Sequence, residues 1–179
     1  MSKRVLVLSG SPRALGNTDL LCASFIDGAM MNDNIVEQVF VRDKHIAYCI
    51  GCDVCKEHEG ECVHHDDMEE ILKQMIEADV IVMASPVYFY TIDAQMKTLI
   101  DRSVARYLEI RNKEFYFIMS AADESREALE RTVECFRGFT DCLPGTLEKG
   151  VVYGVGAWKR ESIKGSKAME EAYELGYGV

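Results

Sequence analysis

The sequence predicts an α/β protein whose parallel β-sheet carries helices on both faces. Segments with strand patterning alternate along the chain with segments whose apolar residues have helical spacing, which is typical of strand–helix–strand units. One predicted strand, residues 79–84, is apolar almost throughout, as expected when helices cover both faces of a parallel sheet. A length of 179 residues with 48% apolar residues fits a single domain, residues 1–179, with a sizeable core.

The first strand and the first helix are separated by a polar loop. Residues 3–8 form a short apolar run that stops at a Ser-Gly-Ser-Pro turn, which predicts a strand. From Leu21 to Ala29 apolar residues recur every four positions, which predicts a helix. Asn17 or Thr18 is suited to cap the first turn of this helix.

The next segment holds the second strand, an irregular stretch and a helix. Residues 35–41 alternate in a way that is typical of a strand, whereas residues 45–66 are irregular and contain four of the seven cysteines. A helix is predicted to follow, through residue 77, with an aspartate at position 66 or 67 as its cap.

The remaining elements repeat the alternation. The third strand, residues 79–84, stops at Ser85-Pro86, and the helix after it is predicted to run from residue 93 to about residue 107 with Val104 on its inner face. The other predicted elements are strands at 114–119 and 149–155 and helices at 125–138 and 167–175.

Three loops are expected to form the functional site. In open parallel sheets ligands bind beyond the carboxyl ends of the strands, where the strand order switches. The loops at those ends are residues 9–18, 85–92 and 120–125, and they are rich in Ser, Gly, Pro and aromatic residues.

The first loop is suited to an anion such as a phosphate. It leads into a predicted helix start, where unpaired N–H groups favour negative charge. Ser9, Ser11, Asn17 and Thr18 can add polar side chains, and Arg13 adds a positive charge. The loop lacks Gly-Lys-Ser/Thr and Gly-x-Gly-x-x-Gly, so it matches neither nucleotide fingerprint. A simple strand-to-helix turn is the alternative.

The second loop is suited to a flat ring. Tyr88, Phe89 and Tyr90 follow a buried strand directly, and such rings can receive a conjugated ligand. The alternative is that these aromatic residues pack beneath the following helix, which we expect at least in part for Phe89.

These segments together resemble the NADPH-dependent FMN reductase family, the flavodoxin-like group that includes the iron–sulfur flavoproteins. The resemblance covers most of the chain. It is carried by Gly-Ser-Pro-Arg at 10–13 with Asn17-Thr18, Ser-Pro-Val-Tyr-Phe-Tyr at 85–90, Gln-Met-Lys at 95–97, Asp-Arg at 101–102 and Gly-Val-Gly-Ala-Trp at 154–158. Near the end of the chain Glu161-Ser162 stands where the family often has Gly-Asp.

The resemblance implies a three-layer sandwich with a five-stranded parallel sheet in the order 2-1-3-4-5, and it implies FMN as cofactor. It assigns the FMN phosphate to Ser9, Ser11, Arg13, Asn17 and Thr18. It assigns the isoalloxazine ring and ribityl chain to Pro86, Val87, Tyr88 and Phe89. Ser120, Ala121, Ala122 and Asp123 would close the site.

Four cysteines in the irregular segment are candidate metal ligands. Cys49, Cys52, Cys55 and Cys62 follow the pattern C-x2-C-x2-C-x6-C, whose first three positions have the bacterial ferredoxin spacing. Four thiolates also suit a structural zinc ion, and free thiols without metal are a third possibility. The resemblance to iron–sulfur flavoproteins implies a [4Fe–4S] cluster.

Other polar and thiol groups are expected to be structural. We expect Cys22 and Cys135 in the core, and Asp101-Arg102 as an ion pair or a subunit contact.

Charge and hydropathy argue against several classes of partner. The net charge of −10 disfavours nucleic acids and anionic membranes, which need a basic face. No segment is apolar over about 18 residues, so no membrane insertion is expected. The N-terminal apolar run is too short for a signal peptide, which predicts a cytoplasmic protein.

The resulting hypothesis is an FMN-dependent oxidoreductase. It would pass electrons from NAD(P)H or a ferredoxin-like donor to a quinone, another small molecule or a protein, with the cluster as a relay. The flavin would carry the chemistry, so no catalytic side chain is expected. A homodimer or homotetramer is expected to cover the open flavin face. The alternatives are a non-enzymatic flavin electron carrier and a thiol-based redox or metal sensor.

Overall fold

Five parallel strands form the central layer of the molecule. In the computed structural model, which describes residues 2–179, the sheet has the order β2-β1-β3-β4-β5. This confirms the strand order that the family resemblance implies. The strands are β1 (Arg4–Ser9), β2 (Ile35–Phe40), β3 (Val80–Pro86), β4 (Glu114–Ser120) and β5 (Leu147–Gly154).

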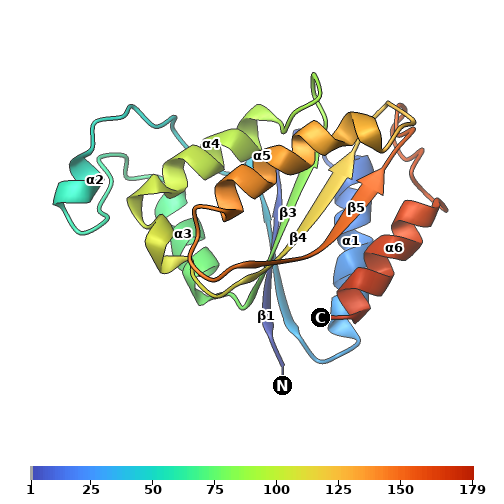
Figure 1. Cartoon of the computed structure of the whole chain (residues 1–179), viewed down its shortest axis with the longest axis horizontal. Coiled ribbons are helices and arrows are strands. Elements are labelled where there is room, and N and C mark those ends of the chain that lie inside the picture. Colours follow the sequence, from blue (N-terminus) through green and yellow to red (C-terminus); the bar gives the residue numbers. More distant parts are fainter. Residues whose placement is uncertain (1) are drawn as a thin grey trace.

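Helices cover both faces of this sheet (Figure 1). Helices α1 (Asn17–Met30) and α6 (Lys167–Tyr177) lie side by side on one face, and α3 (Met68–Glu77), α4 (Ala94–Arg102) and α5 (Glu130–Thr140) cover the other. The short helix α2 (Val54–Glu57) projects from the edge of the molecule (Figure 1). None of the helices in residues 2–179 combines the length and the continuous apolar character that a membrane span requires.

Successive strand residues alternate between two cores. Val5 and Val7 of β1 pack toward α1 and α6, and Leu6 and Leu8 pack toward α3, α4 and α5. All seven residues of β3 are buried, because this central strand lies between the two helix layers. The near-continuous apolar run of β3 therefore reflects its burial on both faces.

Several predicted boundaries are wrong, by between one and five residues. The N-cap of α1 is Gly16 rather than Asn17 or Thr18. Helix α4 ends at Arg102, and the chain continues in two single 3₁₀ turns, η2 (Ser103–Ala105) and η3 (Tyr107–Glu109). The hydroxyl of Ser103 donates to the carbonyl of Leu99, a contact that competes with regular helix continuation. As a result Val104 is partly exposed instead of facing inward.

One of the two remaining 3₁₀ turns lies before the irregular residues 45–66, here named the cysteine segment, and the other lies before α5. They are η1 (Val41–Asp43) and η4 (Glu127–Leu129). Helix α5 therefore begins five residues later than the predicted position 125.

Candidate functional site

Backbone hydrogen bonds gather the strand-end loops at one edge of the sheet. The N–H of Gly10 donates to the carbonyl of Ala84 at 2.8 Å, which joins the loop after β1 to β3. The N–H of Val87 donates to Ser120, and the N–H of Ala121 donates to Gly154, both at 2.8 Å. The loops that follow β1, β3, β4 and β5 are thus held next to one another.

These loops enclose a cavity of about 380 Å³, here named the strand-end cavity. Nine of the thirteen predicted FMN-binding residues line it, together with three residues that were not predicted, Gly16, Ala157 and Trp158. The nine are Ser11, Arg13, Asn17, Thr18, Pro86, Val87, Tyr88, Ser120 and Ala122.

The other four predicted residues do not line the strand-end cavity. Ser9 is buried and donates to Asp19, and Ala121 contributes its backbone groups to neighbouring loops. The carboxylate of Asp123 accepts from the N–H of Ser125. Phe89 is fully exposed, so the expectation that it packs beneath the following helix is wrong.

The exposure of Phe89 has a local cause. Tyr88 and Thr91 exchange two backbone hydrogen bonds, which makes Phe89 and Tyr90 the two central residues of a tight turn. Both central residues have positive φ angles, 50° and 62°. A bulky side chain in that region of φ is strained, so the turn presents its aromatic tip to solvent at a conformational cost.

Asp19 organises the loop that leads into α1. Its buried carboxylate accepts hydrogen bonds from the hydroxyl of Ser9 at 2.8 Å and from the N–H of Leu15 at 2.9 Å. It also forms an ion pair at 2.9 Å with Arg42, which lies just after β2. The loop is therefore fixed before any ligand binds, because the acceptor side chain is already saturated by protein donors.

The start of α1 fits an anion. Its N-cap, Gly16, has no side-chain acceptor for the N–H groups of the first turn. The hydroxyls of Ser11 and Thr18 lie in the same strand-end cavity, with Arg13 at its edge. Free N–H groups, hydroxyls and a guanidinium are the donors that a phosphate requires.

Gly10 is required where this loop passes α4. A Cβ at Gly10 would lie 2.5 Å from the carboxylate of Asp93. That carboxylate caps α4 through the N–H of Met96 and accepts from the hydroxyl of Ser85. Burial raises the pKa of Asp93 above its usual value, since desolvation outweighs the hydrogen bonds from Ser85 and the α4 backbone.

Side-chain hydrogen bonds from the first turn of α1 hold two other segments that line the strand-end cavity. The hydroxyl oxygens of Thr18 and Ser120 lie 2.8 Å apart and both side chains are buried. The amide of Asn17 donates to the carbonyls of Ala157 at 3.0 Å and Lys159 at 2.8 Å. Asn17 thus draws the segment after β5 over the cavity, and this brings Trp158 to its edge.

Aromatic and apolar groups also line the strand-end cavity. Val87, Tyr88 and Trp158 line it, and the Trp158 side chain is largely exposed. The cavity therefore has an anion-binding end at α1 and a ring-binding end at the loop after β3. This combination suits a phosphorylated molecule with a flat conjugated ring.

The four predicted metal ligands surround a second cavity, here named the cysteine cavity, of about 740 Å³. Cys49, Cys52, Cys55 and Cys62 all line it, as does Cys142 from the turn after α5. None of the seven cysteines is in a disulfide. Between residues 2 and 179, however, no three Cys, His, Asp or Glu side chains converge closely enough to hold a metal ion.

The surroundings of the four thiols nevertheless fit a thiolate-bound centre. The cysteine cavity has apolar walls that include Ile100, Leu108 and Phe139. Two buried polar atoms beside it, Nε of Arg102 and Nε2 of His64, have no hydrogen-bond partner. Orphaned polar atoms in such a place fit a bound group that carries hydrogen-bond acceptors.

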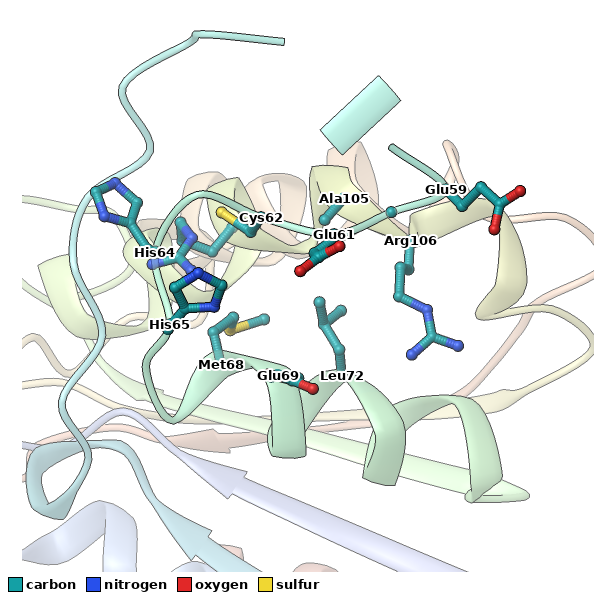
Figure 2. Close-up of a pocket in the computed structure, with 12 residues that line it drawn as sticks. Glu59, Glu61, Cys62, His64, His65, Met68, Glu69, Leu72, Ala105 and Arg106 are labelled. Atoms are coloured by element: carbon teal, nitrogen blue, oxygen red, sulfur yellow. The ribbon is translucent and has the colours of Figure 1, made fainter. Parts of the chain in front are cut away.

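A smaller pocket of about 200 Å³ lies between the return of the cysteine segment and helix α3 (Figure 2). We name it the side pocket. Figure 2 shows Cys62, His64 and His65 at one end of it and Arg106 toward the other, with Met68 and Leu72 of α3 below. Arg102, Cys62 and His64 line both the side pocket and the cysteine cavity.

Arg102 pairs with a different residue from the one expected. Its guanidinium donates to the carboxylate of Asp66 at 2.7 and 3.0 Å, whereas Asp101 pairs with Lys97. Burial raises the pKa of Asp66, but hydrogen bonds from Arg102 and from the N–H groups of Ala47 and Met68 outweigh it and lower the pKa to about 2.

Of Cys22 and Cys135, which were both expected in the core, only Cys22 lies there. Cys22 is fully buried in the core as expected, and burial holds its thiol pKa far above the usual value. Cys135 is only half-buried, and its sulfur lies 3.1 Å from the hydroxyl oxygen of Thr91.

Comparisons with known proteins point to one family. The NADPH-dependent FMN reductase family matches residues 3–144. An iron-sulfur flavoprotein of Methanocaldococcus jannaschii is 45% identical over 112 residues, which are 62% of this chain and 58% of that protein. A second iron-sulfur flavoprotein of the same organism is 30% identical over 178 residues, covering 96% of this chain and 88% of the relative.

The chain thus matches little more than half the length of the first of these relatives. Among solved structures, an FMN-dependent NADH-azoreductase from Bacillus anthracis in complex with FMN superposes with a TM-score of 0.72. It is 15% identical and the match covers 98% of this chain and 96% of the other, a similarity of fold.

Proposed function

The chain belongs to the NADPH-dependent FMN reductase family, and from this premise we propose that it is an FMN-dependent oxidoreductase. It takes electrons from NAD(P)H or a ferredoxin-like donor and passes them to a quinone, another small molecule or a protein. The observation that carries this proposal is the strand-end cavity, with anion donors at the start of α1 and aromatic walls after β3.

The chain's own residues bind and orient the cofactor. The first-turn N–H groups of α1, the hydroxyls of Ser11 and Thr18 and the guanidinium of Arg13 hold the phosphate. Val87, Tyr88 and Trp158 lie against the ring. When bound, FMN supplies hydride acceptance and one- or two-electron release, so the protein contributes position and electrostatics.

The four cysteines hold a [4Fe–4S] cluster in this proposal. Support comes from the C-x2-C-x2-C-x6-C spacing, from the common cavity that the four thiols line and from relatives named iron-sulfur flavoproteins. Because the thiols do not converge, the loop must close around the metal as it binds. A zinc ion is the alternative to the cluster, since four thiolate ligands also suit zinc.

A second copy of the chain covers the open side of the flavin site. Trp158, which lines the strand-end cavity, is 75% exposed. Phe89, in the loop after β3 that adjoins the cavity, is fully exposed. Exposed aromatic rings close to a binding cavity are typical of an interface. We therefore expect a homodimer or homotetramer, which solution scattering of the FMN-loaded protein measures; a monomer would contradict it.

Anaerobic purification tests the proposal as a whole. We expect near-stoichiometric FMN in the optical spectrum, four iron and four sulfide per chain without zinc, and steady-state NAD(P)H oxidation with a quinone or ferricyanide. Bound FMN without turnover would favour a non-enzymatic electron carrier. Metal or reactive thiols without FMN would favour a thiol-based sensor.

A further inference from the structure

One buried guanidinium ties both stems of the cysteine segment to the end of α4. Nη1 of Arg102 donates to the carbonyl of Ala47 at 2.7 Å, where the segment begins, and to Oδ2 of Asp66 at 2.7 Å, where it ends. Nη2 donates to Oδ1 of Asp66 at 3.0 Å. The carboxylate of Asp66 also accepts from the N–H of Ala47 at 2.9 Å, so the two stems are fixed to each other and to α4.

The third nitrogen of this guanidinium, Nε, donates no hydrogen bond. Nε of Arg102 is buried and has no hydrogen-bond partner. The residue as a whole is only 3% exposed, so water does not supply the missing partner. Only four buried side-chain polar atoms between residues 2 and 179 lack a partner, and another of them is Nε2 of His64. Leaving a buried N–H unpaired costs free energy, so an acceptor is expected here when the site is complete.

Cys62 is placed to supply that acceptor. Cys62, His64 and Arg102 line both the cysteine cavity and the side pocket, so the two orphaned atoms belong to neighbours of one thiol. A neutral thiol is a weak acceptor, whereas a metal-bound thiolate accepts hydrogen bonds strongly.

We propose that Arg102 is a positioning residue for the four-cysteine centre. It holds the stems of the segment through Asp66 and Ala47, and its Nε donates a hydrogen bond to the sulfur of Cys62 when that sulfur is a metal ligand. The proposal rests on the iron–sulfur centre of the proposed function. An N–H···S bond disperses the negative charge of a reduced cluster, so it raises the reduction potential.

The test compares Arg102→Lys with Arg106→Lys. Arg106 lines the same side pocket but pairs with Glu109, so its replacement leaves both stems intact. Lysine keeps the charge at position 102, but one ammonium cannot serve Ala47, both oxygens of Asp66 and Cys62 together. Hydrogen–deuterium exchange is measured on the metal-free, FMN-loaded protein, and the cluster potential is measured on the iron-loaded protein by EPR-monitored redox titration.

The two readouts separate the parts of the proposal. For Arg102→Lys we expect exchange in residues 45–66 about tenfold faster and a cluster potential shifted to more negative values, with the flavin potential unchanged. Arg106→Lys should change neither. Wild-type exchange and potential in Arg102→Lys would overturn the proposal.

Two further outcomes are decisive. If the wild-type chain takes up no iron and sulfide, the cluster proposal and the Cys62 contact both fail, and the exchange data alone decide whether Arg102 holds the stems. If Arg102→Lys does not fold, the double variant Asp66→Asn/Arg102→Met replaces it. This variant removes both buried charges and keeps an acceptor for the N–H of Ala47. An unchanged cluster potential in it would overturn the Cys62 contact.

Discussion

The carboxylate of Asp66 and the guanidinium of Arg102 form two parallel hydrogen bonds, at 2.7 and 3.0 Å, with both side chains only 3% exposed. This buried pair fixes the cysteine segment to α4, 36 residues away in the sequence. Because both charges are out of water, each depends on the other, and breaking the pair from one side should be far more damaging than at a surface ion pair.

The first prediction is a loss of stability at low pH that depends on Asp66. The pKa of Asp66 is lowered to about 2 in the folded protein, from a usual value near 3.8. The pair therefore contributes its full stability above about pH 4, and this contribution disappears as the pH falls toward 2, by about 2 kcal/mol in total. Urea unfolding between pH 6 and pH 2 measures it.

Asp66→Asn is the matched variant for this measurement. It should lose about 3 kcal/mol at pH 6, because Arg102 becomes an unpaired buried charge. It should also lack the Asp66 part of the acid transition. An acid transition of unchanged size in Asp66→Asn would contradict the assignment.

The second prediction concerns the anion-binding end of the strand-end cavity. Thr18→Val keeps the shape of the side chain but removes the hydroxyl that lies 2.8 Å from Ser120. We expect FMN to bind about tenfold more weakly, since a hydrogen bond to a charged group is worth about 1.5 kcal/mol or more. Ser24→Ala is the control, because that hydroxyl also lies on α1 but donates to Met169, away from the cavity. Equal FMN affinity in both variants, measured by flavin fluorescence titration, would rule out the role of Thr18.

The third prediction separates the four ligand cysteines from their neighbour. Cys142 lines the cysteine cavity but lies outside the C-x2-C-x2-C-x6-C set. Cys52→Ser should therefore abolish or strongly reduce iron and sulfide content after anaerobic reconstitution, and Cys142→Ser should retain both. Iron retained in Cys52→Ser and lost in Cys142→Ser would reverse the ligand assignment.

The fourth prediction concerns the aromatic turn after β3. Phe89 and Tyr90 have positive φ angles, and Phe89 is fully exposed within its own chain. Urea unfolding at protein concentrations where the chain is monomeric therefore measures the turn without any loss of packing at the proposed subunit interface. Replacing Phe89 and Tyr90 with Asn and Gly should relieve strain and raise the free energy of unfolding by about 1 kcal/mol.

Tyr48→Gly is the control for the turn. Tyr48 is also exposed, but it is not among the described residues with positive φ, so glycine there should lower stability. If the turn variant unfolds more easily than the wild type, the strain account is wrong.

The sequence was sufficient to predict the sheet and the location of the strand-end cavity. The apolar run of β3 and the regular spacing in α1 reflect burial, which leaves a strong local pattern. Because ligands bind beyond the carboxyl ends of parallel strands, the loops containing Ser11 and Tyr88 were expected at the site, and both residues line the strand-end cavity. The strand order itself came from the family resemblance.

What the sequence did not predict depends on contacts between distant residues. In the sequence Asp19 is an ordinary acidic residue in the first turn of α1. Only its contacts with Ser9, Leu15 and Arg42 show that it organises the loop between β1 and α1. Arg102 was expected beside Asp101, its neighbour in sequence, yet it pairs with Asp66. The Gly-Val-Gly-Ala-Trp segment was the available signal for Trp158, but nothing local to it predicts a place in the cavity.

The start of α1 binds the phosphate of FMN in the proposed function, and a comparison of FMN with riboflavin tests this most directly. The two molecules share the ring and the ribityl chain and differ only in the phosphate. Equilibrium titration of the flavin-free protein should give a dissociation constant for FMN at least about a hundredfold lower, as expected for several charge-assisted hydrogen bonds. Equal affinity for FMN and riboflavin would contradict the account.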